Sequence, residues 1–314
     1  MLQNFVHSLY YTRRSMIAIL LLLAKSAEIA LAAQADGFYS HRSEWSRKHL
    51  HGVSLHKAIG TMRHGHYQHN SSRKYSAWIS VLDYGADPTG KSDSSAAIVR
   101  CLEAAANMSS GLDPDIGASD LSVSLEGGNY MVNSPVAFPG RSKGFGLNDG
   151  AIFAGPSFPI DRHLIEVLPQ ADGTPTELAF TNLVIDARHK GGCFRSDAVV
   201  QITIQEVFFL HFSTAGIYAS GEFGSGHELM VSKCFFAEYM WGEQGYDDKA
   251  AKTGIAVNMT YPDSHVIDSI FRCSLIGVRN AGGSNLFQGL HIYTTCTHGS
   301  GPANMTDGFV AAGS

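Results

Sequence analysis

The chain has 314 residues, of which 44% are hydrophobic and 16% are charged, and its formal net charge at pH 7 is −5. This length is sufficient for one elongated domain with a large core. The mild acidity gives no support to a nucleic-acid partner, since nucleic-acid-binding domains usually carry a basic surface. The 33 glycines are typical of a chain with many tight turns between short strands.

The first 35 residues have the pattern of a secretory signal peptide. Arg13 and Arg14 precede an apolar run over residues 16–24, and several alanines follow before residue 36. A membrane anchor is the alternative, but the run is shorter than the roughly 20 residues that a membrane-spanning helix needs. We therefore expect residues 1–35 to be removed and the mature chain to be secreted, extracellular and free of the membrane.

Residues 36–76 are polar and rich in histidine, and we expect them to form a flexible exposed leader. A metal site at His64 and His66 is the alternative, but no cysteine or acidic ligand accompanies these residues. The five cysteines of the chain include no CxxC pair, so zinc is not expected either. We predict no metal and no cofactor.

Four Asn-x-Ser/Thr sequons support export, because such sequons are N-glycosylated only in secreted chains. Any one of them can arise by chance, but four behind a signal peptide make a stronger joint case. The predicted glycosylation sites are Asn70, Asn107, Asn258 and Asn304.

Ordered structure is predicted from about residue 78, with a first strand over residues 79–82. Asp93 or Ser94 is expected to cap a helix over residues 96–106. The apolar residues of this helix fall on one face. An amphipathic helix of this kind suits the open hydrophobic end of a solenoid, where it would serve as a cap.

A short strand pattern recurs five times after residue 177. Each copy has an apolar residue, then two mostly polar residues, and then three residues of which the first and third are expected to point inward. The copies begin at Phe180, Ile204, Val231, Ile267 and Phe287. Successive starts are 24, 27, 36 and 20 residues apart, which corresponds to one coil of a β-solenoid with insertions between strands. Because such coils bury their apolar face only by stacking, we predict an all-β solenoid over residues 77–314.

A resemblance to a known family begins at residue 81, with the sequence Val-Leu-Asp-Tyr-Gly-Ala-Asp-Pro-Thr-Gly-Lys-Ser-Asp-Ser-Ser-Ala-Ala-Ile. It resembles the opening motif of the pectate-lyase-like right-handed β-helix superfamily, which includes polygalacturonases, rhamnogalacturonases and phage tail-spike enzymes. Residues 125–136 resemble the family's next landmark, a Gly-rich turn into a strand that contains Tyr130. The resemblance covers residues 78–310 and is greatest to the plant QUARTET-type polygalacturonases.

This resemblance implies a right-handed parallel β-helix with an N-terminal capping α-helix. It also implies a monomeric glycoside hydrolase that cleaves α-1,4-galacturonan, the pectin polysaccharide of the cell wall. A solenoid needs caps at both ends, and none follows the last expected strand near Val310. We therefore expect C-terminal coils to be missing from the domain at 77–314.

The outward position of the repeat carries large side chains that suit a sugar platform. If the first, fourth and sixth positions of each copy point inward, the fifth points outward. Stacked rings there would pack against sugars, unless a loop or the leader covers them. Arg272 breaks the apolar pattern of its copy, so either the register shifts there or Arg272 reaches a carboxylate. The predicted substrate-binding residues are Phe235, Phe271, Arg272 and His291.

Hydrolysis of a glycosidic bond needs two carboxyl groups that flank it. The predicted catalytic residues are Asp247, Asp248, Asp263 and Asp268. Asp268 belongs to the fourth copy of the repeat, and Asp248 precedes it by 20 residues, about one coil. Each acid also has a simpler interpretation, because Asp263 follows a proline and suits a turn, whereas Asp247 and Asp248 suit a solvated loop.

The polygalacturonase hallmarks carry over only in part. Asp247-Asp248 follows Tyr246 where the family has Gly-Asp-Asp, and His298-Gly299 lacks the preceding glycine. The Asn-Thr-Asp and Arg-Ile-Lys triplets are absent. The resemblance therefore implies the reaction only at the level of its class. A pectate or rhamnogalacturonan lyase and a noncatalytic wall-binding β-helix are the alternative functions.

Overall fold

The computed structural model describes residues 77–109, 121–221, 225–240 and 253–293, together with the backbone of residues 307–311. The predicted signal peptide (1–35) and leader (36–76) lie outside the described residues. So do four of the predicted site residues, namely Asn70, Asp247, Asp248 and Asn304.

The described residues form two parallel sheets. Sheet A has thirteen strands and sheet B has seven. Sheet A begins with β1 (Ala77–Ser80), β2 (Leu121–Ser124), β3 (Asn129–Val132), β5 (Phe145–Ala154) and β7 (Thr176–Asp186). It continues as two rows, the first of which is β9 (Val200–Gln205), β12 (His227–Ser232), β15 (His265–Ile267) and β18 (Leu286–Gln288). The second row is β10 (Phe208–Leu210), β13 (Phe235–Ala237), β16 (Ile270–Arg272) and β19 (His291–Tyr293).

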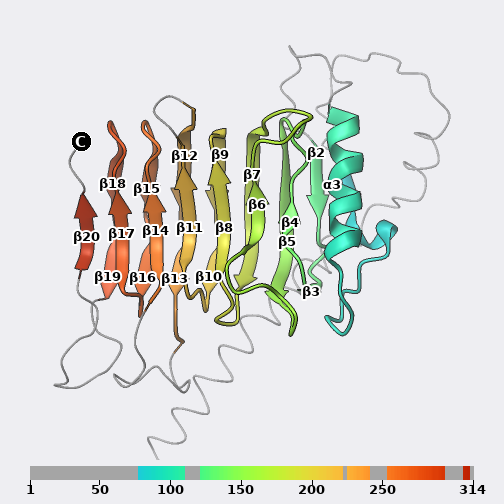
Figure 1. Ribbon diagram of the computed structural model, residues 1–314, viewed down its shortest axis with the longest axis horizontal. Coiled ribbons are helices and arrows are strands. Elements are labelled where there is room, and N and C mark those ends of the chain that lie inside the picture. The colour runs from blue at the N-terminus through green and yellow to red at the C-terminus, as the bar shows by residue number, and fades with distance from the viewer. Residues whose placement is uncertain (1–76, 110–120, 222–224, 241–252, 294–306, 312–314) are drawn as a thin grey trace, which may run out of the picture. The chain divides into compact units, whose positions relative to one another are not determined.

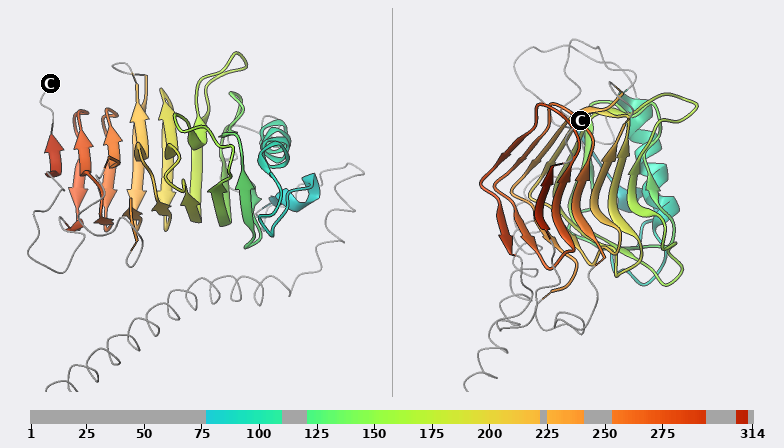
Figure 2. Two further views of the ribbon diagram at one scale, coloured as in Figure 1. Left: turned by 60° about the horizontal axis from the view of Figure 1, so that its bottom comes forward. Right: turned by 60° about the vertical axis from the view of Figure 1, so that its left-hand side comes forward.

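Sheet B contains one strand from each coil. Its members are β4 (Val136–Ala137), β6 (His163–Val167), β8 (Gly192–Asp197), β11 (Ala215–Ser220), β14 (Ile255–Met259), β17 (Ile276–Asn280) and β20 (Asp307–Ala311). The chain passes from sheet B to the first row, then to the second row, and then back to sheet B one coil further on (Figure 1). Figure 2 shows the strands of successive coils stacked side by side. This arrangement confirms the predicted all-β parallel β-helix.

Stacked aromatic rings fill the interior, because equivalent positions of successive coils lie directly above one another. The ring of Phe209 is 4.8 Å from that of Phe236, and Phe236 is 4.8 Å from Phe271, with the planes within 8° of parallel. All three side chains are fully buried. The repeat therefore stabilises the fold by placing large apolar side chains in continuous columns.

Tight corners join the first row to the second, and one residue of each corner has a left-handed backbone. The corner residues Glu206, Lys233, Asp268 and Gly289 have φ values between 48° and 64°. The backbone N–H of Asp268 donates to the carbonyl of Gln288 in the next coil, at 2.9 Å. The corners thus continue the hydrogen bonding between coils while the chain changes direction.

The predicted register of the fourth repeat copy is wrong by one residue. Val266, not Ile267, pairs with Val231, and Phe236 pairs with Phe271. Phe271 is therefore fully buried and Ile270 is 37% exposed, the reverse of the prediction. Ser269 takes the fourth, inward position. Its hydroxyl accepts a hydrogen bond from the N–H of Cys234 and donates to the carbonyl of Ile267, so a polar residue is tolerated in the core.

Helix α3 (Ser95–Ser109) lies beside the first coils (Figure 1) and buries the apolar face predicted for it, including Ile98, Cys101 and Leu102. The carbonyl of Ser94 accepts the first helical hydrogen bond, from Ile98, so Ser94 is the N-cap residue, and Asp93 Oδ1 accepts from the N–H of Ser95 at 3.0 Å. The strand predicted over residues 79–82 ends earlier, since residues 81–84 form the 3-10 helix η1 (Val81–Tyr84). No helix among the described residues is both long and apolar enough to span a bilayer.

Candidate functional site

A row of polar side chains crosses sheet B, with one residue from each of five neighbouring strands. The pairing of the strands places these residues in one line, and their neighbours in sequence, such as Ile217 and Ala219, are buried in the core. The row therefore lies on the outer face of the sheet. Its members are Glu166, Arg195, Tyr218, Asn258 and Arg279.

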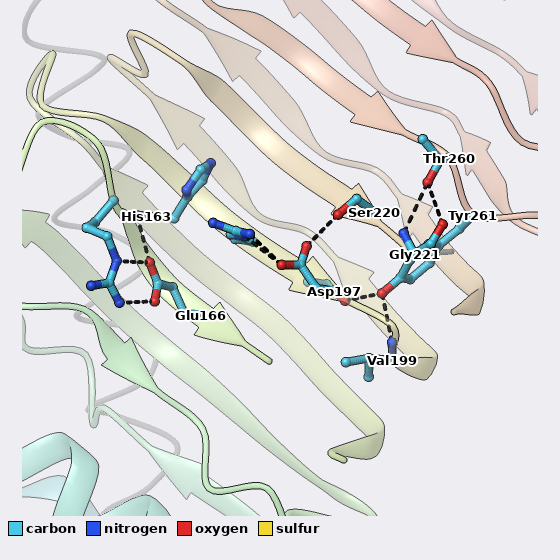
Figure 3. Close-up of polar contacts among 11 residues, drawn as sticks. His163, Glu166, Asp197, Val199, Ser220, Gly221, Thr260 and Tyr261 are labelled. Carbon is cyan, nitrogen blue, oxygen red and sulfur yellow. Dashed lines mark hydrogen bonds and ion pairs between the residues drawn. The ribbon is translucent and has the colours of Figure 1, made fainter. Parts of the chain in front are cut away.

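Glu166 is buried, and Arg162 neutralises its charge. The guanidinium donates to both carboxylate oxygens, at 2.8 Å and 2.5 Å, and the backbone N–H of His163 donates to Glu166 Oε1 at 3.2 Å (Figure 3). The hydrogen bonds to Glu166 raise the pKa of Arg162. A buried carboxylate whose two oxygens both accept hydrogen bonds from one arginine suits a structural role more than a catalytic one.

Arg195 and Asp197 form a second ion pair on the next strand. Arg195 donates to Asp197 Oδ2 from Nε at 2.9 Å and from Nη2 at 2.5 Å, and Ser220 Oγ donates to Asp197 Oδ1 at 2.6 Å (Figure 3). The guanidinium carbon of Arg195 also lies 5.5 Å from the centre of the Tyr218 ring. These contacts fix the Arg195 head group beside the ring.

A pocket of about 260 Å³ opens beside this row. We call it the His163 pocket. Its lining residues are His163, Arg195, Thr214, Ala215, Tyr218 and Asn258. They come from β6, β8, β11 and β14 and from the residue before β11, so four successive coils contribute to one depression.

His163 is the most constrained side chain of the pocket. It is only 8% exposed, and neither ring nitrogen has a hydrogen-bond partner in the described part of the chain. Burial lowers the pKa of His163 to about 4, and the cations of Arg195 and Arg162 act in the same direction, while Glu166 and Asp197 oppose it. The ring is therefore neutral at pH 7 and offers one donor and one acceptor.

Tyr261 holds the neighbouring end of sheet B in place. Its buried hydroxyl makes a 2.8 Å hydrogen bond with Ser196 Oγ and accepts from the backbone N–H of Val199, also at 2.8 Å (Figure 3). Burial raises the pKa of Tyr261 to about 12. This network connects β8 to the segment after β14, and it fixes the coil that carries Arg195 and Asp197.

Asp263 and Asp268 lie at opposite ends of β15, in left-handed corners with φ values of 53° and 48°. Both are exposed. Five residues of extended chain separate them by about 16 Å, at about 3.3 Å per residue. Paired glycosidase carboxyl groups are about 5–9.5 Å apart, so these two cannot act as one catalytic pair. The catalytic role of each remains a prediction.

The predicted substrate-binding residues lie on sheet A, apart from the row on sheet B. Phe235 is half-buried, with its ring 5.5 Å from that of Phe208, and it belongs to the same outward line as His291. Arg272 is half-buried and lies 5.7 Å from the Tyr293 ring. The placement of Phe271 in this surface is wrong, because its side chain is in the core. Ile270 takes the outward position instead.

Two predicted glycosylation sites fall within the described residues. Asn107 is exposed on α3, and its Oδ1 accepts a hydrogen bond from Arg141 Nε at 3.0 Å. Asn258 is half-buried in the middle of sheet B and lines the His163 pocket. The sequence signal does not distinguish these two environments.

The comparisons with known proteins agree with this fold. No family model matches the chain. Polygalacturonase QRT3 of Arabidopsis thaliana is 30% identical over 230 residues, which make up 69% of this chain and 46% of that relative. The chain thus spans just under half of the relative's length.

Two solved structures are similar to this chain, and at their low sequence identities they support the fold alone. A mutant tailspike of E. coli bacteriophage HK620 in complex with a pentasaccharide has a TM-score of 0.54 at 14% identity, over 74% of this chain and 44% of the tailspike. A candidate glycosyl hydrolase from Parabacteroides merdae has a TM-score of 0.51 at 10% identity, over 68% of this chain and 97% of its own.

The chain is a parallel β-helix whose sequence is similar to that of a polygalacturonase. The likeness confirms the resemblance to QUARTET-type polygalacturonases that the opening motif indicated.

Asp307 is a further candidate that the sequence reasoning did not name. The polygalacturonase triplet Asn-Thr-Asp is absent in full, but Thr306 and Asp307 match its last two residues, with Met305 before them. The backbone of β20 begins at Asp307 and pairs with β17 at Ile276. Through the pairing of sheet B, Asp307 occupies the same line as His163 at the start of β6. Allowing one mismatch in the triplet would have found it.

Proposed function

We propose that the chain is a secreted glycoside hydrolase that cleaves α-1,4-linked galacturonan, with the polysaccharide lying across the strands on the outer face of sheet B. The observation that carries this proposal is the polar row with its pocket, in a chain that is 30% identical to a polygalacturonase. Strands about 4.8 Å apart present equivalent residues at regular steps, which suits a polymer with a regular repeat.

The charge of the row favours an acidic sugar. Glu166 and Asp197 are each neutralised by an arginine. Arg279 is the next member of the row after Asn258, and it makes no ion pair with a carboxylate in the described part of the chain. The row therefore carries an excess positive charge. Guanidinium groups bind carboxylates well, so a uronate residue is a better ligand than a neutral sugar.

Asp307 is the acid that we assign to catalysis. Hydrolysis needs a second carboxyl group, which protonates the leaving oxygen or activates water. Asp247 and Asp248 precede β14 in the sequence, Asp307 is the first residue of β20, and β14 and β20 are parallel strands of sheet B. We therefore propose that Asp307 acts together with Asp247 or Asp248.

Secretion is part of this proposal. Cys273 is disulfide-bonded, whereas Cys101, Cys193 and Cys234 are free and buried. Disulfides persist in oxidising compartments such as the extracellular space. The disulfide thus supports the export that the signal-peptide pattern of residues 1–35 predicts, and with it an extracellular site of action on the cell wall.

The test is an activity assay on purified protein with de-esterified galacturonan. Reducing ends report hydrolysis, and the absorbance of an unsaturated product, measured with and without chelator, reports elimination. We expect saturated products, no effect of the chelator, and a loss of at least about a hundredfold in Asp307→Asn, as for the loss of a general acid or base. Asp83→Asn, at an exposed residue of η1, is the matched control and should retain wild-type activity.

Other outcomes would identify the alternatives. Loss of activity in Asp268→Asn but not in Asp307→Asn would move the site to the corner of sheet A that the sequence predicted. An unsaturated product would indicate a lyase. Binding of galacturonan without any product would indicate a noncatalytic wall-binding β-helix, an alternative that the two neutralised carboxylates of sheet B favour.

A further inference from the structure

The His163 pocket contains polar groups that the protein itself leaves unsatisfied. Both nitrogens of His163 lack partners although the side chain is 92% buried. A buried polar group without a hydrogen bond is unfavourable by about 1–3 kcal/mol. Such groups persist where water or a ligand completes their hydrogen bonds, so the pocket has the character of a binding site and not of a packing defect.

The other side chains of the pocket are available in the same way. The hydroxyls of Thr214 and Tyr218 and the amide of Asn258 make no side-chain hydrogen bond to any described residue. Arg195 uses Nε and Nη2 to bind Asp197, which leaves Nη1 for another acceptor. The pocket therefore combines a neutral imidazole, two hydroxyls, an amide, a guanidinium N–H and one aromatic ring.

This set of groups matches a single acidic sugar. Each sugar hydroxyl is both a donor and an acceptor, as are the neutral imidazole and the amide. The guanidinium N–H suits the uronate carboxylate. The volume of about 260 Å³ is just below the range of about 300–1,000 Å³ that is usual for sites of drug-sized ligands, so one sugar residue is the appropriate size.

His163, at one end of the pocket, is distant from Asp307. His163 begins β6, and Asp307 occupies the same line on β20, five strands further along sheet B. Five steps of about 4.8 Å separate the two backbone positions by about 24 Å. Asn258, at the other end of the pocket, is on β14, two strands from β20. A sugar that contacts His163 would therefore lie several sugar residues away from a bond cleaved at Asp307.

We propose that the His163 pocket is a remote subsite that binds one uronate residue of a long substrate, with His163 hydrogen-bonded to a sugar hydroxyl and Arg195 to the carboxylate. The identity of the polymer rests on the proposed function. The pocket's preference for an acidic sugar is tested separately, by binding without turnover.

The first experiment measures binding by calorimetry. The probes are trigalacturonate and the neutral galactotriose, and the variants are His163→Phe, which keeps a ring but removes both nitrogens, and Tyr218→Phe, which removes one hydroxyl. We expect affinity for trigalacturonate to fall about threefold to tenfold in each variant, as for one lost hydrogen bond, and galactotriose to bind more weakly than trigalacturonate. His265→Phe is the matched control, since His265 lies on β15 of sheet A.

The second experiment uses substrate length. In His163→Phe, kcat/KM for a galacturonan oligomer of about eight residues should fall by the same factor, mainly through KM, since strands about 4.8 Å apart place His163 several sugars from Asp307. Digalacturonate cannot reach from Asp307 to His163, so its kcat/KM should not change. His163→Gln retains a donor and an acceptor and should restore much of the affinity.

The failures of the two proposals are distinguishable. If the wild-type protein cleaves nothing but binds trigalacturonate in a manner that depends on His163, the hydrolase proposal fails and the subsite stands. Wild-type affinity in folded His163→Phe and Tyr218→Phe would overturn the subsite even if hydrolysis is normal. Equal losses for digalacturonate and the long oligomer would also overturn it, because the effect would then not be remote.

Discussion

The register of the fourth coil can be tested with two adjacent residues. Phe271 is fully buried, and its ring stacks on Phe236 at 4.8 Å, whereas the neighbouring Ile270 is 37% exposed on the outer face. Replacement of each by alanine removes apolar side-chain atoms from opposite sides of the same strand. The two variants are therefore matched in location and differ in burial.

The expected effects differ several-fold. Truncation of a buried Phe to Ala lowers the free energy of unfolding by about 3–5 kcal/mol, because a cavity remains. Ile270→Ala removes a side chain that already contacts water, and we expect a loss of about 1 kcal/mol. At about 2–4 °C per kcal/mol for a domain of this size, Phe271→Ala should lower Tm by about 10 °C and Ile270→Ala by about 3 °C.

The assay is thermal unfolding followed by circular dichroism at one fixed scan rate, since irreversible unfolding makes Tm depend on the rate. Phe208→Ala is a further control, because Phe208 is a half-buried outward residue of the second row. Equal Tm losses for Phe271→Ala and Ile270→Ala, or a larger loss for Ile270→Ala, would refute the register and return Phe271 to the surface.

Two further predictions concern sheet B. First, the folded-state pKa of His163 is about 4, below its ordinary value of 6.5, so between pH 6.5 and pH 4 the unfolded chain binds a proton that the folded chain does not. The free energy of unfolding should therefore fall by up to about 3 kcal/mol as the pH drops through this window. Urea unfolding at pH 7 and pH 4 measures this loss, which should be absent in His163→Phe. The same pH dependence in wild type and His163→Phe would contradict the burial of the neutral ring beside Arg162 and Arg195. Second, Asn258 lines a pocket within a sheet, so glycopeptide mass spectrometry of secreted protein should find it unmodified; a glycan there would fill the His163 pocket and exclude a sugar ligand.

Most of the solenoid could be predicted because its core repeats. Four of the five copies were placed in the correct register, and helix α3 was found with its buried face. The fourth copy failed for a specific reason: Ile267 and Ile270 are three residues apart and imitate the inward positions, while the true inward residue is Ser269. A serine whose hydroxyl is hydrogen-bonded to the backbone within the core cannot be recognised from apolar periodicity.

The polar row on sheet B could not be predicted in the same way. Its members precede the first position of the following copy by 14, 9, 13, 8 and 8 residues, because the turns between sheet B and sheet A differ in length. No fixed spacing in the sequence therefore marks the row. Only the strand pairing brings the five residues into line, and only the structure shows that His163 is buried with no hydrogen-bond partner among the residues described.

The stacking of coils explains why the residues that stabilise this fold differ from those that we propose to bind substrate. Each inward position must match the coil above and below it, so a change there affects the stacking of neighbouring coils, as at Phe271. The outward side chains of sheet B do not enter these columns, although their backbones pair with the next coil like the others. Arg195, Tyr218 and Asn258 could therefore diverge without loss of the fold, whereas Glu166 is buried and ion-paired with Arg162. The strand pairing and the burial of the side chains establish the inward columns, whereas the proposed substrate site lies on the outward row. Variants of that row, and not of the repeat, will test the polysaccharide binding that we propose.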